Sequence, residues 1–217
     1  MDDPAKIWDD ILASKLPTEN TTATASAYQR CRLRLSRQPT AIHLKHRPRN
    51  PALIPEGLRK VIRSLVSGEA PWPLFVAGPA GVGKTCAGLC LLDYAGGWYR
   101  TVEEFCEDLR IAELRGLDWR TPEARGTYWP ADLWRQVEQA RLVVLDELGA
   151  REKVSDHHYA AVKRLVDLRE GKPLVCLSNL GLGDLARLYD DRLTSRLSAG
   201  TVVILEGPDR RLRKDSP

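Results

Sequence analysis

The sequence lacks the features that mark a membrane or exported protein. No apolar run approaches the roughly 20 residues that a helix needs to span a bilayer. The chain begins with the acidic stretch Met1-Asp2-Asp3-Pro4, whereas a signal peptide begins with a basic and then an apolar segment. We therefore expect a soluble, cytoplasmic protein.

The cysteines give little support to disulfide or metal chemistry. The five cysteines are an odd number and include no Cys-x-x-Cys pair. Neither a disulfide framework nor a zinc site is indicated, so we expect free thiols. Cys86 and Cys90 are four residues apart on a predicted helix, where we expect small buried side chains and keep a redox role as the alternative.

The length and the charge distribution indicate a domain with an extension. A chain of 217 residues can form one sizeable core, and we expect one α/β domain preceded by an N-terminal segment. The net charge of +4 is modest, but its distribution is uneven. Leaving histidine aside, all charged residues of 30–49 are basic, whereas most charged residues of 1–20 are acidic. Lysine and arginine at this density can neutralise nucleic-acid phosphates. A solvated segment is the alternative interpretation.

The most informative stretch is an apolar run followed by a glycine-rich turn and an Ala- and Leu-rich helix. Residues 73–77 predict a buried strand that ends at the turn. The turn matches the phosphate-binding pattern G-x-x-x-x-G-K-[ST] in the strand-to-helix context that the pattern requires. It consists of Gly78, Pro79, Ala80, Gly81, Val82, Gly83, Lys84 and Thr85.

These residue types suit a nucleoside triphosphate. Glycines let the loop turn its N–H groups inward, and the start of the next helix adds partial positive charge. We expect Lys84 to reach the β- and γ-phosphates and the Thr85 hydroxyl to bind Mg²⁺.

A second buried strand ends in two carboxylates. Residues 142–145 are consecutive aliphatics, which predict a strand covered on both faces. Asp146 and Glu147 follow at the carboxyl end, where open α/β sheets bind their ligands. Adjacent buried carboxylates are costly unless a cation or hydrogen-bond donors offset them. We predict that Asp146 completes the Mg²⁺ site with Thr85, and that Glu147 polarises the attacking water.

Further polar residues follow later strands. The apolar run 174–177 ends in Ser178-Asn179, and we expect the Asn179 amide to orient the lytic water or contact the γ-phosphate, with a turn-forming role as the alternative. Arg192 and Arg196 are four residues apart and share one face of a predicted helix. Residues 116–130 predict a loop. The alternation of strands and helices elsewhere predicts a mostly parallel sheet with helices on both faces.

In this order, the motifs resemble the AAA+ ATPases of the DnaC/IstB type, which are bacterial replicative-helicase loaders and transposition helpers. The resemblance covers about residues 53–214. Residues 78–85 correspond to Walker A, 142–149 to Walker B, 177–180 to sensor 1 and 191–197 to the arginine-finger region. The resemblance implies an α/β P-loop NTPase of the AAA+ type, with a five-stranded, mostly parallel sheet flanked by helices. The sequence departs from the AAA+ pattern in one respect, because we expect no full C-terminal lid domain after the last strand.

The resemblance also implies ATP with Mg²⁺, ATPase activity and a nucleotide-dependent homo-oligomer. In such an oligomer Arg192 or Arg196 of one subunit would complete the site of its neighbour, and Arg210 or Arg211 would be a second sensor. We expect residues 1–50 to be a helical and basic extension that binds a partner or DNA, and residues 51–217 to be the ATPase domain.

The expected partners are a replicative DNA helicase and single-stranded DNA. One alternative is an IstB-like transposition helper that binds double-stranded DNA and a transposase. Another is a nucleotide-gated adaptor with negligible turnover.

Overall fold

The computed structural model describes residues 50–116 and 130–210. The predicted N-terminal extension up to residue 49 lies outside the described residues, as do Arg211 and most of the predicted loop 116–130. Among the helices of the described ranges, none is long and apolar enough to cross a membrane.

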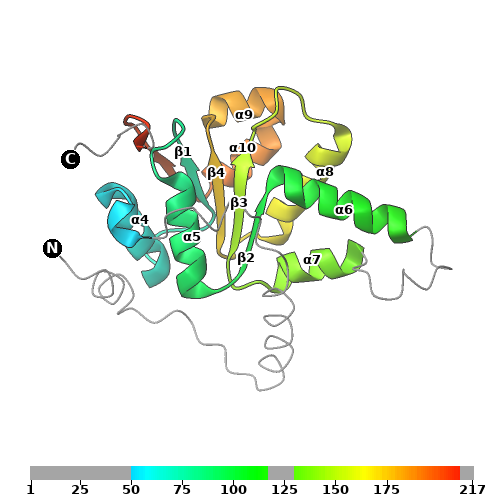
Figure 1. Cartoon of the computed structure of the whole chain (residues 1–217), viewed down its shortest axis with the longest axis horizontal. Coiled ribbons are helices and arrows are strands. Elements are labelled where there is room, and N and C mark those ends of the chain that lie inside the picture. Colours follow the sequence, from blue (N-terminus) through cyan, green and yellow to red (C-terminus); the bar gives the residue numbers. More distant parts are fainter. Residues whose placement is uncertain (1–49, 117–129, 211–217) are drawn as a thin grey trace, which may run out of the picture.

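A five-stranded parallel sheet forms the centre of the structure (Figure 1). The strand order is β2-β3-β4-β1-β5. All strands point the same way, so their carboxyl ends meet at one edge, where the segments after β1, β3 and β4 become neighbours. The strands are β1 (Leu74–Ala77), β2 (Trp98–Thr101), β3 (Val143–Leu148), β4 (Leu174–Ser178) and β5 (Thr201–Ile204).

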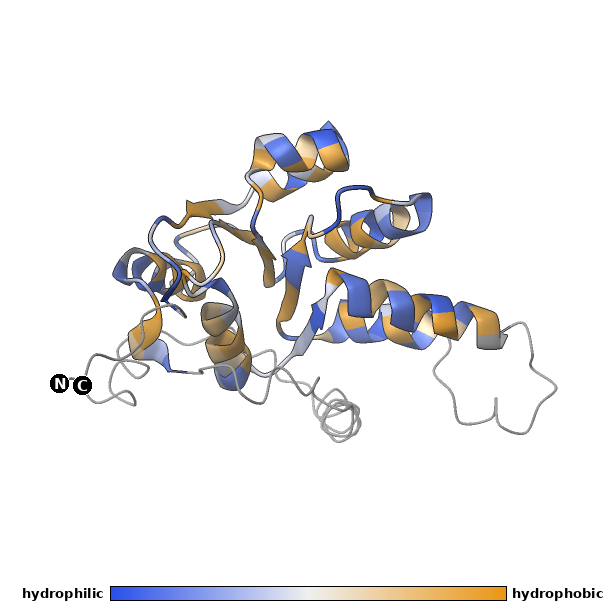
Figure 2. Cartoon of the chain, turned by 45° about the horizontal axis from the view of Figure 1, so that its top comes forward, coloured by the Kyte–Doolittle hydropathy of each residue, from blue (hydrophilic) through white to orange (hydrophobic). Residues whose placement is uncertain are grey.

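Helices cover both faces of the sheet (Figures 1 and 2). On one face lie α4 (Glu56–Ser67) and α5 (Lys84–Ala95), preceded by the short 3₁₀ helix η1 (Pro51–Leu53). The other face is covered by α6 (Val102–Gly116), α7 (Pro130–Gln139), α8 (Asp156–Leu168), α9 (Leu182–Leu188) and α10 (Asp191–Ser198).

Alternation along the strands divides the core into two layers. In β1, Leu74 and Val76 pack with α4 and α5, whereas Phe75 packs with the helices of the opposite face. Figure 2 shows the same arrangement, since the apolar sides of the helices face the apolar strands. The sheet is therefore buried on both sides, as the aliphatic strands predict.

The alternating strands and helices and the parallel sheet are confirmed, and the sheet is wholly parallel in the described residues. Cys86, Cys90, Cys106 and Cys176 are buried free thiols, as expected. One element was missed, because no helix was predicted for the residues of α7. Its Leu133, Trp134 and Val137 are buried at helical spacing, and the Trp134 ring packs edge-on against Phe105.

Candidate functional site

The glycine-rich turn joins β1 to α5 in a conformation that requires glycine at specific positions. Gly81 and Gly83 have φ angles of 75° and 108°, which residues with a Cβ rarely adopt. A Cβ on Gly81 would also overlap the carboxyl group of Asp209, and one on Gly78 would overlap the carbonyl oxygen of Leu205. The loop is thus closely enclosed by the segment that follows β5.

Lys84 begins α5 and bends back along the loop. Its Nζ donates hydrogen bonds to the carbonyl oxygens of Gly78 and Pro79, at 2.6 and 2.7 Å. The side chain is buried, with 7 % of its surface exposed. These contacts hold a positive charge within the turn that the sequence predicts to bind phosphates.

Asp146 lies at the end of β3 and is fixed by several donors. Its Oδ2 accepts hydrogen bonds from Thr85 Oγ1 at 2.8 Å and from the Tyr99 hydroxyl at 2.7 Å, and its Oδ1 accepts the backbone N–H of Glu147 at 2.7 Å. The residue is 4 % exposed. The structure therefore brings Thr85 and Asp146 together, although 61 residues separate them in the sequence.

Glu147 differs from its neighbour in conformation and exposure. It is the one non-glycine residue with positive φ in the described ranges, at 60°, and its side chain is exposed. The pairing of β3 with β4 shifts between Leu145 and Leu148, so Glu147 lies in an irregular part of the strand. Such irregularities redirect side chains, and strained backbone of this kind is frequent at functional sites.

The tips of β3 and β4 are joined by hydrogen bonds. Ser178 Oγ donates to the Leu148 carbonyl at 2.6 Å and accepts the Leu180 N–H at 2.9 Å. Asn179 lies between these bonded residues, and its side chain is exposed. It therefore stands at the same edge as Glu147, on the neighbouring strand.

The two predicted arginines lie on α10 and have different surroundings. Arg192 is exposed. Arg196 forms ion pairs through Nε with Asp167, at 2.8 Å, and through a terminal guanidinium nitrogen with Glu170, at 2.9 Å. The helical face that they share thus offers one exposed arginine and one that is held against α8 and the turn after it.

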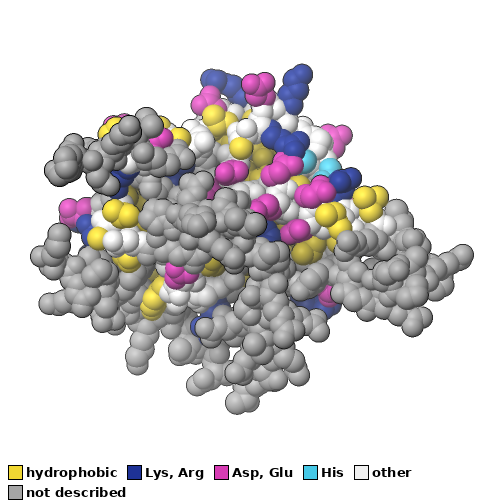
Figure 3. All heavy atoms as spheres, in the orientation of Figure 1, with side chains coloured by type: hydrophobic (Ala, Val, Ile, Leu, Met, Phe, Trp, Pro, Cys, Tyr) yellow, Lys and Arg dark blue, Asp and Glu magenta, His cyan; other side chains and the backbone are white. Residues whose placement is uncertain are grey.

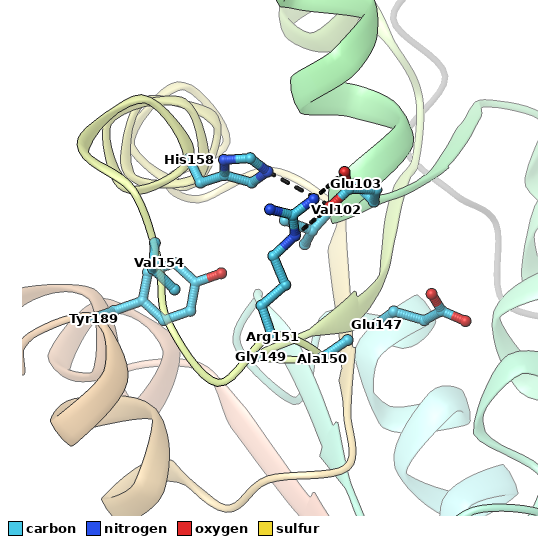
Figure 4. A pocket seen from close by; sticks show the side chains of 9 residues that line it. All are labelled: Val102, Glu103, Glu147, Gly149, Ala150, Arg151, Val154, His158 and Tyr189. Atoms are coloured by element: carbon cyan, nitrogen blue, oxygen red, sulfur yellow. Dashed lines mark hydrogen bonds and ion pairs between the residues drawn. The ribbon is translucent and has the colours of Figure 1, made fainter.

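A small pocket lies next to Glu147 (Figure 4). Arg151 donates to both carboxylate oxygens of Glu103, and His158 Nε2 is 3.6 Å from the same carboxylate. The Glu147 side chain points away from this cluster in Figure 4. Charges of both signs are interleaved on this part of the surface (Figure 3). They pair with one another, and Glu147 remains separate from them.

Sequence reasoning missed two features of the site. Tyr99 was not predicted to belong to the site, since its contact with Asp146 depends on the pairing of β2 with β3. The segment after β5 also contacts the loop, because the Arg210 N–H donates to the Gly81 carbonyl at 3.2 Å. Arg210 was named as a candidate second sensor, and its guanidinium donates to the Leu53 carbonyl at 2.6 Å.

The described residues fit a magnesium-bound triphosphate in their chemistry. A hydroxyl and a carboxylate are oxygen ligands of the type that Mg²⁺ prefers, and Mg²⁺ is usually held by one or two carboxylates together with phosphates. The lysine and the glycine-rich turn supply the positive charge and the backbone N–H groups that phosphates require.

A parallel sheet of this order, with the glycine-rich turn after β1 and the acidic pair in β3, defines a P-loop NTPase fold of the AAA+ type. The sequence matches no protein-family model and no curated protein. Solved structures do match, and they include a replication initiation protein and a helicase loader.

Domain III of the replication initiation protein DnaA from Thermotoga maritima is 20% identical, with a TM-score of 0.57 over 76% of this chain and 71% of that one. DnaA bound to AMPPCP and single-stranded DNA is 18% identical, with a TM-score of 0.58 over 74% of this chain and 51% of that one. A DnaC helicase loader is 16% identical, with a TM-score of 0.49 over 90% of this chain and 98% of that one. The chain thus spans about half the length of the DnaA structures that contain AMPPCP, and the likeness to DnaA establishes its fold.

Proposed function

We propose that this protein binds and hydrolyses ATP with Mg²⁺, and that it assists the loading of a replicative DNA helicase on single-stranded DNA. The observation that carries the nucleotide part is the hydrogen bond between Thr85 and Asp146 beside a glycine-rich loop that holds a buried lysine. These residues come from β3 and from the start of α5, and their positions match what Mg²⁺ and phosphate chemistry need.

The buried and half-buried side chains of the site would bind the phosphates and Mg²⁺, and the exposed ones would position the attacking water. Lys84 and the loop N–H groups would bind the phosphates, while Thr85 and Asp146 would hold Mg²⁺, which neutralises phosphate charge when bound. Glu147 is exposed beside the buried Asp146, so its carboxylate is free to orient a water and accept its proton. Asn179, at the tip of the neighbouring strand, would help to position that water.

We assign the arginine that completes a neighbouring subunit's site to Arg192. Arg196 is committed to Asp167 and Glu170, and reaching another subunit would break both ion pairs. Arg192 is exposed and can make a new contact without that loss. Arg196 would then orient α10 against α8.

The partner assignment rests on the sequence resemblance to helicase loaders. Residues 1–50 are the proposed partner- or DNA-binding segment, ahead of an ATPase domain at residues 51–217. The basic run 30–49 supports contact with nucleic-acid phosphates. A structure with the same fold contains AMPPCP and single-stranded DNA, which are ligands of the proposed classes.

Calorimetry with MgATP tests the nucleotide site. Lys84→Ala should weaken binding by at least about 100-fold, because it removes the loop's own cation from the phosphates. Lys60→Ala is the matched control, since Lys60 is exposed on α4 and pairs with Glu56. Equal affinity of the Lys84 and Lys60 variants would contradict the assignment.

Fluorescence anisotropy with labelled oligonucleotides tests the DNA part on the full chain. The proposal expects tighter binding to single-stranded than to double-stranded DNA in the presence of AMPPCP, and co-elution with a purified replicative helicase. Preference for double-stranded DNA without helicase binding would favour the transposition helper. Full helicase binding by a chain that does not turn over ATP would favour the nucleotide-gated adaptor.

A further inference from the structure

The Tyr99 hydroxyl is a donor to Asp146 that packing alone does not require. Tyr99 lies in β2, and its ring packs in the core layer beneath α4 and α5. A phenylalanine would fill the same space. The hydroxyl adds a hydrogen bond of 2.7 Å to Asp146 Oδ2, the oxygen that also accepts from Thr85.

The Tyr99 phenol is buried next to the Asp146 carboxylate. Burial, together with the nearby charge of Asp146, raises the pKa of Tyr99 far above its ordinary value. The residue is 7 % exposed, so water has little access to it. The Tyr99 hydroxyl is therefore held as a buried donor to the Asp146 carboxylate.

The three donors to Asp146 differ in whether they would also have to bind the metal. The Thr85 hydroxyl is itself a predicted metal ligand, so its oxygen has a second role. The Glu147 N–H is part of the backbone and holds the other carboxylate oxygen. Tyr99 is the side chain in this group that has no other role at the site, and it is anchored in a neighbouring strand.

We propose that Tyr99 is a positioning residue that fixes the Asp146 carboxylate for magnesium. The inference rests on the proposed function, because it assigns a role toward the metal of the same site. Residues that orient a metal ligand typically change metal affinity about 10- to 100-fold when they are removed. On the proposed function the loop and Lys84 would hold the nucleotide phosphates, whereas the Tyr99 hydroxyl donates to Asp146.

The test measures how ATP binding depends on magnesium in Tyr99→Phe. The concentration of Mg²⁺ needed for half-maximal enhancement of ATP binding should rise about 10-fold or more, while affinity for ATP in EDTA stays at the wild-type value. Tyr159→Phe is the matched control, because it also removes a tyrosine hydroxyl that donates to an aspartate, Asp190, outside the phosphate site. It should leave the magnesium dependence unchanged.

A double-mutant cycle separates positioning from general loss of structure. If Tyr99 acts through Asp146, then Tyr99→Phe should have no further effect on magnesium dependence in an Asp146→Asn background. Equal effects in both backgrounds would overturn the proposal, as would an unchanged magnesium dependence in Tyr99→Phe. Failure of the wild-type protein to bind ATP at all would instead refute the proposed function.

Discussion

Arg169 is a buried charged residue whose guanidinium donates hydrogen bonds to backbone carbonyl oxygens. It is 1 % exposed, and burial lowers the pKa of its guanidinium to about 10. The guanidinium donates to the carbonyl oxygens of Val137, Glu138 and Ala140 at the end of α7, and to that of Pro173 before β4. It thereby satisfies helix-end carbonyls that have no intrahelical partner.

We predict that Arg169→Leu lowers the free energy of unfolding by about 2–4 kcal/mol, because buried carbonyls lose their donors. Urea denaturation measures the change. Arg110→Leu is the comparison, since Arg110 is exposed and pairs with Glu107 one helical turn away. A similarly small effect of both substitutions would show that water replaces the guanidinium.

At the residue level the phosphate loop could be predicted from a local motif. The contacts between distant segments could not be predicted. The turn 78–85 carries its own signal, because glycine and lysine spacing reflects local geometry. Tyr99, Arg169 and Asp209 depend on strand register and on which segments meet, and neither follows from local spacing. A single sequence therefore indicates the ligand more readily than the residues that support the site.

Among the elements, α10 depends on its first residues. Asp190 precedes the helix, and its side chain accepts the Leu193 N–H at 2.8 Å and the Tyr159 hydroxyl at 2.5 Å. This is an N-cap, which satisfies an otherwise unpaired donor of the first turn. Because α10 carries Arg192, the cap also fixes the backbone position from which the Arg192 side chain extends.

We predict that Asp190→Ala lowers the free energy of unfolding by about 1 kcal/mol at pH 7, with a smaller loss for Asp190→Asn. The hydrogen bond from Tyr159 is the main cause that lowers the pKa of Asp190 in the folded protein. A lowered pKa contributes stability above the unfolded-state value of about 3.9, and that contribution is lost as the pH falls through the folded-state pKa.

The difference between wild type and Asp190→Ala should therefore shrink below about pH 4. Denaturation series at pH 7, 5 and 3 measure it. Asp184→Ala is a suitable control, because Asp184 lies in the first turn of α9 and pairs with the exposed Arg187. A constant difference across the series would mean that the charge of Asp190 adds nothing to the cap.

The strength of the periodic signal decided which helices were predictable. The faces of α4 and α8 are regular, and Ser155 marks the start of α8 as an N-cap, since its side chain accepts the His158 N–H. The residues of α7 begin where the predicted loop 116–130 ends, and the sequence led to no prediction for the rest of this short helix. Its burial comes from packing against α6 and α8, which a single segment does not reveal.

At the scale of the whole molecule, the assignment of Arg192 predicts that hydrolysis depends on assembly. Arg192→Ala should leave MgATP affinity unchanged but lower turnover at high protein concentration by about 10³-fold or more, the range measured for arginines supplied in trans. Turnover per subunit in the wild type should rise with protein concentration. Both are measured by steady-state phosphate release.

The neighbouring arginine supplies the comparison within the same helix. Arg196→Ala removes ion pairs to Asp167 and Glu170, so we expect a loss of stability and a smaller loss of turnover. A larger loss of turnover in Arg196→Ala than in Arg192→Ala would reverse the assignment. Independence of turnover from protein concentration would count against any arginine acting between subunits.

Segments from both ends of the described chain converge on the phosphate loop. Arg210 bonds to Gly81 through its N–H and to Leu53 through its guanidinium, and the Asn50 carbonyl accepts from the Cys86 thiol at 3.6 Å. Asn50 and Arg210, the first and last described residues, thus contact the first turn of α5 and the phosphate loop directly. A label or substitution at Asn50 or Arg210 is therefore not a neutral change, and the altered and unaltered proteins should be compared before any nucleotide affinity is assigned to the protein itself.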